Sequence, residues 1–261
     1  MPPPGNRRLS ALEVVAILAA GLAAGTINAV VGSGTLITFP VLLAFGFAPV
    51  TANVSNTLGL APGALTSAFG YRRELEGQGR RARRLAGLSI SGAVLGAVLL
   101  LELPASAFKT IVPAFIVLAL LLILAQPRLG RALAAHAERR DRVRGQEGPA
   151  VFGAVFVTGV YGGYFGAAQG IMLLAILGLG LDESLQRVNA LKNLLAGLAN
   201  LVSGIVFAFA APHVDWTAAA LLAVGSVTGG ALGARYGRRL SPDALRALIV
   251  AVGIVAIVRL I

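Results

Sequence analysis

The chain has no cysteine, only two histidines and few acidic residues. Without cysteine it can form neither disulfides nor a thiol-based active site, and two isolated histidines do not suggest a metal centre. Asp and Glu number 11 in 261 residues, and charged residues of both signs make up 13%. Soluble domains carry about 25% charged residues, so this composition excludes an ordinary water-soluble fold.

The sequence motifs of common enzymes are also missing. There is no phosphate-binding Walker loop, no nucleophile elbow and no metalloprotease histidine pair. The residues of the apolar segments do not supply an acid, a base and a nucleophile together. We therefore expect no enzymatic activity, no catalytic residues, no metal and no cofactor.

Apolar residues, by contrast, are abundant. They make up 57% of the chain, and the mean hydropathy is +0.83. Six long apolar segments approach or exceed the roughly 20 residues that a helix needs to cross a bilayer. The sequence thus predicts an all-α polytopic membrane protein, which crosses the cell (inner or plasma) membrane several times and has the lipid bilayer as a partner.

The basic residues gather between the apolar segments. Lys and Arg number 22 against 11 Asp and Glu, a net charge of +11. Residues 71–84 and 126–148 each hold six arginines. Short arginine-rich connections mark the cytoplasmic side of a membrane protein. We prefer this interpretation to nucleic-acid binding, and expect no nucleic acid as a partner.

The two halves of the chain resemble each other at a spacing of 136 positions. Gly34 matches Gly170, and Asn53 matches Asn189. The pattern predicts a tail at 1–11, a first repeat at 12–125, a basic cytoplasmic loop at 126–148 and a second repeat at 149–261. Corresponding loops are basic in one copy and not in the other, so we expect the repeats to be inverted across the membrane, as in many secondary transporters.

Each repeat is expected to begin with a broken or re-entrant helical unit, at 12–47 and 149–180, followed by three transmembrane helices. Glycines at 32–35 and 166–170 interrupt these units, and the helix after the first break is too short to cross the bilayer. A helix that begins inside the membrane offers its N-terminal amides to an anion. The alternative is close helix packing, which we prefer for three other glycine pairs, Gly21/Gly25, Gly92/Gly96 and Gly229/Gly233.

Polar residues recur at corresponding places after each break. Their spacing of i, i+3 and i+4 puts them on one helical face; they are Asn53, Asn56 and Thr57 in one copy and Asn189, Lys192 and Asn193 in the other. Lys192 falls roughly 12 Å into its helix. At that depth we prefer contact with an anionic substrate to a lysine that snorkels toward the surface. The asparagines have a simpler alternative role, which is to bond neighbouring helices.

The chain resembles the TauE/SafE family of sulfite and organosulfur anion exporters. The resemblance rests on V-V-G-S-G-T-L-I-T-F-P-V-L-L, on A-N-V-S-N-T, and on G-G-Y-F-G-A-A-Q-G-I-M-L-L followed by V-N-A-L-K-N. It extends from about Leu12 to Val258. Membership would imply a carrier for sulfite, sulfonates or thiosulfate, coupled to a proton or another ion gradient.

Together these patterns favour a secondary transporter of small anions that works by alternating access. An anion channel and a membrane scaffold without flux are the alternatives. The glycine faces also permit a homodimer. The expected substrate-binding residues are Gly34, Thr35, Asn53, Asn56, Thr57, Gln169, Gly170, Asn189, Lys192 and Asn193.

Overall fold

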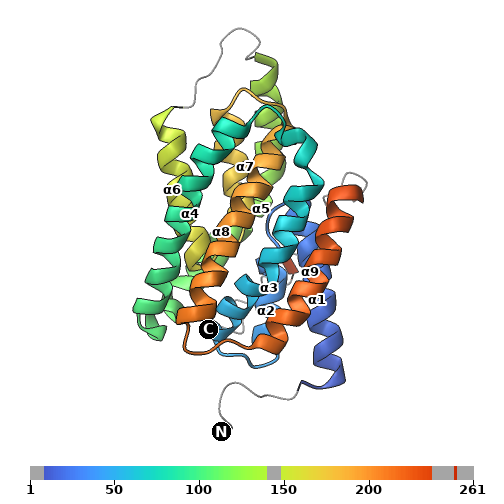
Figure 1. Ribbon diagram of the computed structural model, residues 1–261, viewed down its shortest axis with the longest axis vertical. Helices are drawn as coiled ribbons and strands as arrows, with labels where there is room; N and C mark the ends of the chain where they lie inside the picture. Colours follow the sequence, from blue (N-terminus) through green and yellow to red (C-terminus); the bar gives the residue numbers. More distant parts are fainter. Residues whose placement is uncertain (1–8, 140–147, 237–249, 252–261) are drawn as a thin grey trace.

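The computed structural model describes residues 9–139, 148–236 and 250–251. Every regular element in these residues is a helix, as Figure 1 shows. The first repeat contributes α1 (Ala11–Val30), α2 (Thr35–Ala44), α3 (Pro49–Gly70), the short 3₁₀ helix η1 (Arg72–Leu75), α4 (Gly79–Glu102) and α5 (Ala105–Arg139). The second contributes α6 (Pro149–Tyr164), α7 (Gln169–Gly180), α8 (Leu185–Ala210) and α9 (Trp216–Tyr236).

Five of the described helices are long and apolar enough to span a membrane. They are Ala11–Val30, Gly79–Glu102, Ser106–Arg128, Leu185–Ala210 and Trp216–Tyr236. Large apolar side chains face outward from the bundle, such as Phe209 at 90% exposure and Leu12 at 73%. Such a surface suits lipid rather than water. The all-α, polytopic fold is therefore confirmed.

The two broken units form as the glycines predict. Short non-helical segments, residues 31–34 and 165–168, separate α1 from α2 and α6 from α7. Gly32 and Gly166 have positive φ angles of 86° and 75°, a conformation that glycine adopts without steric cost. The helices after the breaks have 10 and 12 residues, about 15 and 18 Å, so neither crosses a bilayer alone.

Two boundaries differ from the sequence-based expectation. The arginines at 80–84 are not in a loop but in the first turns of α4. Helix α5 does not end near residue 125 but runs on to Arg139, because residues 126–139 are rich in alanine, leucine and arginine, which are strong helix formers. The predicted helix at 242–260 lies outside the described residues, apart from 250–251.

Helices of the first repeat pack against helices of the second. Helix α1 packs against α9, and α4 packs against α6, while α3 and α8 pack together at the centre. Figure 1 shows α4 and α6 at the left, α1 and α9 at the right, and α3 and α8 between them. In this view α1 begins at the lower end of the bundle and α6 begins at the upper end. This arrangement suits inverted repeats, and their inversion across a membrane stays a prediction.

Glycine makes the close helix pairs possible, so the packing interpretation of the three glycine pairs is confirmed. A methyl group on Gly96 of α4 would lie 2.0 Å from the carbonyl oxygen of Val160 in α6. One on Gly229 of α9 would lie 2.0 Å from the carbonyl oxygen of Leu22 in α1. Only a residue without a side chain lets the backbones approach this closely.

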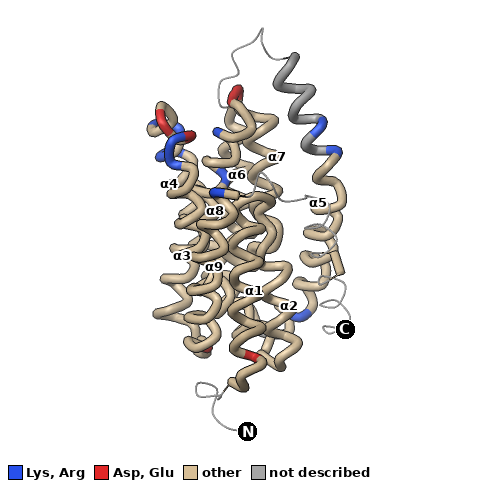
Figure 2. The backbone as a smooth tube through the Cα atoms, turned by 90° about the vertical axis from the view of Figure 1, so that its right-hand side faces the viewer, with Lys and Arg blue, Asp and Glu red and all other residues tan. Residues whose placement is uncertain are grey.

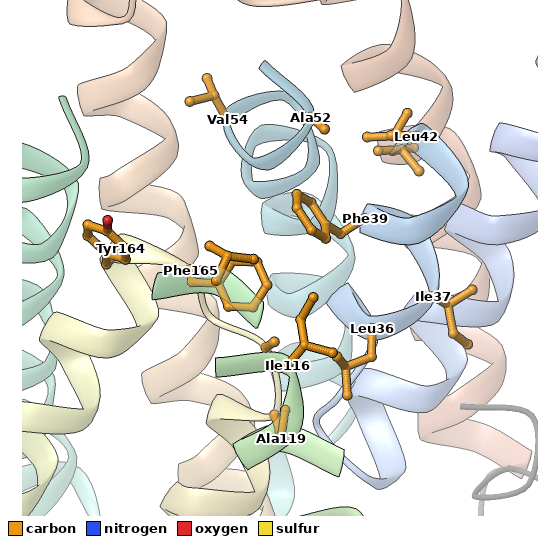
Figure 3. Packing of buried hydrophobic residues seen from close by; sticks show 14 of the residues in the cluster. Leu36, Ile37, Phe39, Leu42, Ala52, Val54, Ile116, Ala119, Tyr164 and Phe165 are labelled. Carbon is orange, nitrogen blue, oxygen red and sulfur yellow. The ribbon is translucent and has the colours of Figure 1, made fainter. Parts of the chain in front are cut away.

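A cluster of aromatic side chains packs beside the two breaks (Figure 3). Phe39 of α2 meets Phe165, which follows α6, edge to face with ring centroids 5.2 Å apart. Phe108 of α5 packs on both of these rings, and Phe115 of α5 packs on Phe165. Such pairs contribute about 0.5–1.5 kcal/mol each beyond burial of their area. The cluster thus joins elements of both repeats beside the breaks.

Charged side chains gather at one end of the bundle. Figure 2 shows most of the described Lys and Arg residues there, near the ends of α4, α5 and α8. Within this region Arg81 of α4 lies 2.6 Å from Glu183, and Arg187 of α8 lies 2.5 Å from the same carboxylate. By the positive-inside rule we expect this end to face the cytoplasm, and this orientation stays a prediction.

Candidate functional site

The two breaks meet inside the bundle. The amide of Gly170, in the first turn of α7, donates a hydrogen bond to the carbonyl of Gly32 at 3.1 Å. A methyl group added to either glycine would lie 2.5 Å from the α-carbon of the other. The two re-entrant units of opposite repeats therefore touch through their backbones, with no side chain between them.

The C-terminal end of α1 is capped by the second repeat. Lys192 of α8 donates from Nζ to the carbonyls of Asn28 at 3.1 Å and Ala29 at 3.5 Å. Asn189 and Asn193 donate from Nδ2 to the carbonyl of Ala29 at 3.3 and 3.2 Å. The last carbonyls of a helix have no partner within the helix and carry its negative dipole end, so these donors stabilise the break.

A corresponding contact caps α6. Asn53 of α3 donates from Nδ2 to the carbonyl of Tyr164, the last residue of α6, at 2.9 Å. Asn53 lies 136 positions before Asn189, and both reach the end of the helix that opens the opposite repeat. The interhelical role of these asparagines is confirmed. The two repeats differ three residues after these asparagines, where the first repeat has Asn56 and the second has Lys192.

Asn56 bonds within its own repeat. Its Oδ1 accepts a hydrogen bond from Thr38 of α2, and its Nδ2 donates to Oγ1 of Thr35 at 3.4 Å. Thr57 donates to the carbonyl of Asn53 in the same helix at 3.0 Å. Asn56 therefore supports the position of Thr35, whereas Thr57 is tied to its own backbone.

Lys192 is buried, with 1% of its surface exposed. Its amine points toward the end of α1, so the alternative that it snorkels to the surface is wrong. Among the described residues no carboxylate lies within ion-pair distance of its Nζ. A lysine at the centre of a membrane helix costs about 3 kcal/mol on insertion scales, so such a residue normally serves a site.

A cavity opens beside Lys192, where α1, α3, α7 and α8 come together. Its volume is about 20 Å³, space for roughly one water molecule. Its wall combines amide side chains, glycine backbone and the lysine; it is lined by Asn28, Gly32, Thr35, Ala64, Gly166, Gln169, Gly170, Lys192, Asn193, Ala196 and Asn200. Hydrogen-bond donors on its wall thus come from both repeats.

Five of the ten residues expected from the sequence line this cavity: Thr35, Gln169, Gly170, Lys192 and Asn193. The other five are not on its wall: Gly34, Asn53, Asn56, Thr57 and Asn189. The amide of Gly34 instead donates to Oδ1 of Asn28 at 2.6 Å. The amides of Gly34 and Gly170 are thus already bonded in this conformation and do not point freely at a ligand.

The binding residues expected from the sequence omit two asparagines of the cavity wall, Asn28 and Asn200. Asn28 has no counterpart in the second repeat, where Tyr164 stands 136 positions later, so the repeat match hid it. Its signal was a polar residue one turn before the break in an apolar helix. Asn200 of α8 lines the cavity as well.

Comparison with known proteins gives matches along nearly the whole chain. It is 27% identical to Escherichia coli K12 "Probable membrane transporter protein YfcA" over 97% of this chain and 89% of that protein. It is 28% identical to "Probable membrane transporter protein ORF9" of Sinorhizobium sp, over 94% and 91%. A "Probable membrane transporter protein" of Haemophilus influenzae is 29% identical, over 92% and 91%. No solved structure gives a significant match.

A family model covers the same region. The model described as "Sulfite exporter TauE/SafE" matches residues 17–260, which include both glycine breaks and the cavity. The resemblance seen in the glycine breaks and the polar helix starts is thereby confirmed. This chain is a multi-pass membrane protein and belongs to the TauE/SafE sulfite exporter family.

Proposed function

We propose that this protein is a secondary transporter of small anions, with sulfur oxyanions as the preferred substrates, and that it works by alternating access. One observation carries the proposal. A buried lysine with no carboxylate partner among the described residues faces a polar cavity where the two repeats meet. An anion bound in the cavity would supply the counter-charge that the protein itself does not place there.

The chemistry of the wall suits an oxyanion. The amide groups of Asn28, Gln169 and Asn200 can each donate two hydrogen bonds through their NH₂ groups. These three residues and Lys192 line the same small space, although Gln169 also donates to the carbonyl of Thr158 at 3.4 Å. Oxygens that carry charge are the acceptors that benefit most from such donors in a water-poor environment.

The size of the cavity favours a carrier over a channel. A space of about 20 Å³ holds roughly one water molecule, which is too little for a hydrated anion to pass between the described residues that line it. An oxyanion therefore enters only after the helices around the cavity separate. Rocking of one repeat against the other, around a site at their interface, gives this opening on each side in turn.

The ends of the bundle hold contacts that such a motion would break. At the basic end Glu183 binds both Arg81 and Arg187, and Arg187 also donates to the carbonyl of Glu76 at 3.1 Å. At the other end the amide of Asp215 donates to Oγ of Ser55 at 2.9 Å. Both sets join the first repeat to the second, as gates between two repeats would.

Family membership supports the substrate class and the location. The family model is described as a sulfite exporter, and the three bacterial relatives are named as membrane transporters. We therefore propose sulfite, sulfonates or thiosulfate as substrates and the inner or plasma membrane as the site of transport. Transport also agrees better with this membership than enzymatic activity does.

Thermal unfolding of the purified protein with a panel of anions tests the proposal. The panel contains sulfite, sulfate, thiosulfate, sulfoacetate, taurine and short carboxylates. A ligand that binds the folded state adds stability, about 2.7 kcal/mol at one hundred times its dissociation constant. We expect one or more sulfur oxyanions to raise the melting temperature with concentration, and the carboxylates to have less effect.

The chain provides a matched control, since it has two lysines. Lys109 is exposed on α5, whereas Lys192 is buried at the cavity. Lys192→Met should abolish the stabilisation by the anion, and Lys109→Met should leave it unchanged. No stabilisation by any anion, or equal stabilisation of both variants, would contradict the proposed site.

Flux assays separate the remaining alternatives. In proteoliposomes without a membrane potential, a carrier shows counterflow, in which unlabelled anion on one side drives accumulation of labelled anion there, whereas a channel gives single-channel currents and no counterflow. A scaffold gives neither.

A further inference from the structure

We propose that Lys192 takes up one proton when the anion binds, so that the loaded transporter carries an anion and a proton together. This inference rests on the proposed function, because it assigns a second role to the same site. It starts from the partners of Nζ, which are the carbonyls of Asn28 and Ala29.

The number of acceptors matches an uncharged amine. A neutral amine has two N–H donors and one lone pair, whereas an ammonium has three N–H donors. Two carbonyl oxygens accept from Nζ in the described structure. A third proton would find its acceptor in the cavity that Lys192 lines, the place proposed for the anion.

Among the described residues that surround Lys192, none supplies a full negative charge for an ammonium. Helices α3 and α7 contain no charged residue, and α6 has only its tyrosines as titratable groups. The charged groups on the other packed elements lie at the ends of the bundle; they are Glu13 on α1, Arg72, Arg73 and Glu74 on η1, Arg80, Arg81, Arg83, Arg84 and Glu102 on α4, and Arg187 on α8 beside Glu183.

The end of α1 offers only partial compensation. A helix C-terminus carries roughly half of a negative charge, and Asn189 and Asn193 already donate to the Ala29 carbonyl that Lys192 also uses. A full positive charge in this apolar region is therefore costly until an anion arrives. The anion and the proton stabilise each other, and reciprocity requires that each raises the affinity of the site for the other.

The proposed proton transfer to and from Lys192 conserves atoms and charge. A hydronium ion on the open side of the transporter gives a proton to the lone pair of Nζ: one O–H bond breaks, one N–H bond forms, water remains, and the ammonium pairs with the anion. Release of the anion on the other side leaves the ammonium unpaired, and the proton returns to water there. The empty site then closes around a neutral amine, which avoids moving a buried charge through the membrane interior.

Calorimetry of thiosulfate binding to the wild-type protein measures this proton directly. Thiosulfate remains ionised across neutral pH, so any proton taken up belongs to the protein. The heat of binding is compared in two amine buffers with different heats of ionisation, since sulfonate buffers could compete for the site. We expect uptake of up to one proton per anion, and a loss of affinity of up to tenfold per pH unit over part of the range between neutral pH and the ordinary lysine pKa of about 10.4.

Two lysine-to-arginine variants identify the group. Arginine remains charged at these pH values, so Lys192→Arg should show no proton uptake and no pH dependence of affinity over this range. Lys109→Arg should behave as the wild type does. If Lys192→Arg does not fold, the proton uptake of the wild type still decides whether binding and protonation are linked.

The outcomes distinguish this inference from the proposed function. Thiosulfate binding without proton uptake in the wild type would overturn the inference and leave an anion site in place. Uptake that persists in a folded Lys192→Arg variant would assign the proton to another group and overturn it too. Absence of binding by every anion in the panel would overturn both.

Discussion

Replacement of Gly170 by alanine should damage this protein far more than an ordinary glycine-to-alanine change in a helix. The added methyl carbon would lie 2.5 Å from the α-carbon of Gly32 and 2.9 Å from its carbonyl oxygen. Carbon atoms in contact normally lie about 3.5–4.0 Å apart. The two breaks must therefore separate by roughly 1 Å, and both atoms that block the methyl group belong to the backbone.

The cost follows from two effects. Overpacking against atoms that cannot rotate away costs about 1–3 kcal/mol. The separation also weakens the hydrogen bond from the amide of Gly170 to the carbonyl of Gly32, now 3.1 Å long, which adds about 1 kcal/mol. We expect Gly170→Ala to lose roughly 2–4 kcal/mol of stability.

Unfolding in mixed micelles by a denaturing detergent measures this loss, with Gly153→Ala as the control. Gly153 lies within α6, and a methyl group there would meet no atom within 4 Å. That variant should be neutral or slightly more stable, since alanine favours a helix more than glycine does. Gly32→Ala should be worse than Gly170→Ala, because Gly32 also has a positive φ of 86°.

Equal stability of Gly170→Ala and Gly153→Ala would refute the reasoning. It would mean that the backbones of the two breaks do not touch, and that the site is not built around their contact. A stable Gly170→Ala variant that nevertheless lost anion binding would leave the site in place and refute only the energetic argument.

Two further predictions concern contacts between the repeats. Asn53→Ala should lower the free energy of unfolding by roughly 1 kcal/mol, because the carbonyl of Tyr164 loses its donor; unchanged stability in the same detergent titration would show that this cap contributes nothing. Arg81→Ala, Glu183→Ala and the double variant should give a coupling energy of up to about 1 kcal/mol for this partly exposed pair. The coupling should shrink at high salt, and a value that does not respond to salt would contradict an ion pair.

Much of the architecture could be predicted from the sequence because it depends on local chemistry. Long apolar segments require a bilayer, and the clustered glycines near residues 32–34 and 166–170 interrupt two of them. Patterns within a few turns of chain predict the beginning of α1, both breaks and the glycine faces of the close helix pairs. The end of α5 was harder, because the same alanine- and arginine-rich residues suit either a surface loop or a longer helix.

The site was only half predictable. Lys192 could be singled out because a charge within an apolar helix is costly wherever that helix packs. The sequence does not say which atoms surround the amine, and the carbonyls of Asn28 and Ala29 are 164 and 163 residues away along the chain. Asn28 carries no repeat signal at all, and it enters the cavity wall only because α1 ends beside α8.

The sequence by itself determined that this chain is a helical membrane protein of two similar halves with interrupted helices, since hydropathy, glycine positions and repeat spacing are properties of the chain. Tertiary structure alone decided that Gly32 touches Gly170, that Asn53 and Asn189 cap opposite helices, and that five of the ten expected residues share one cavity. These are contacts between segments far apart in sequence. Their partners are set by how the two halves pack, which no local pattern encodes.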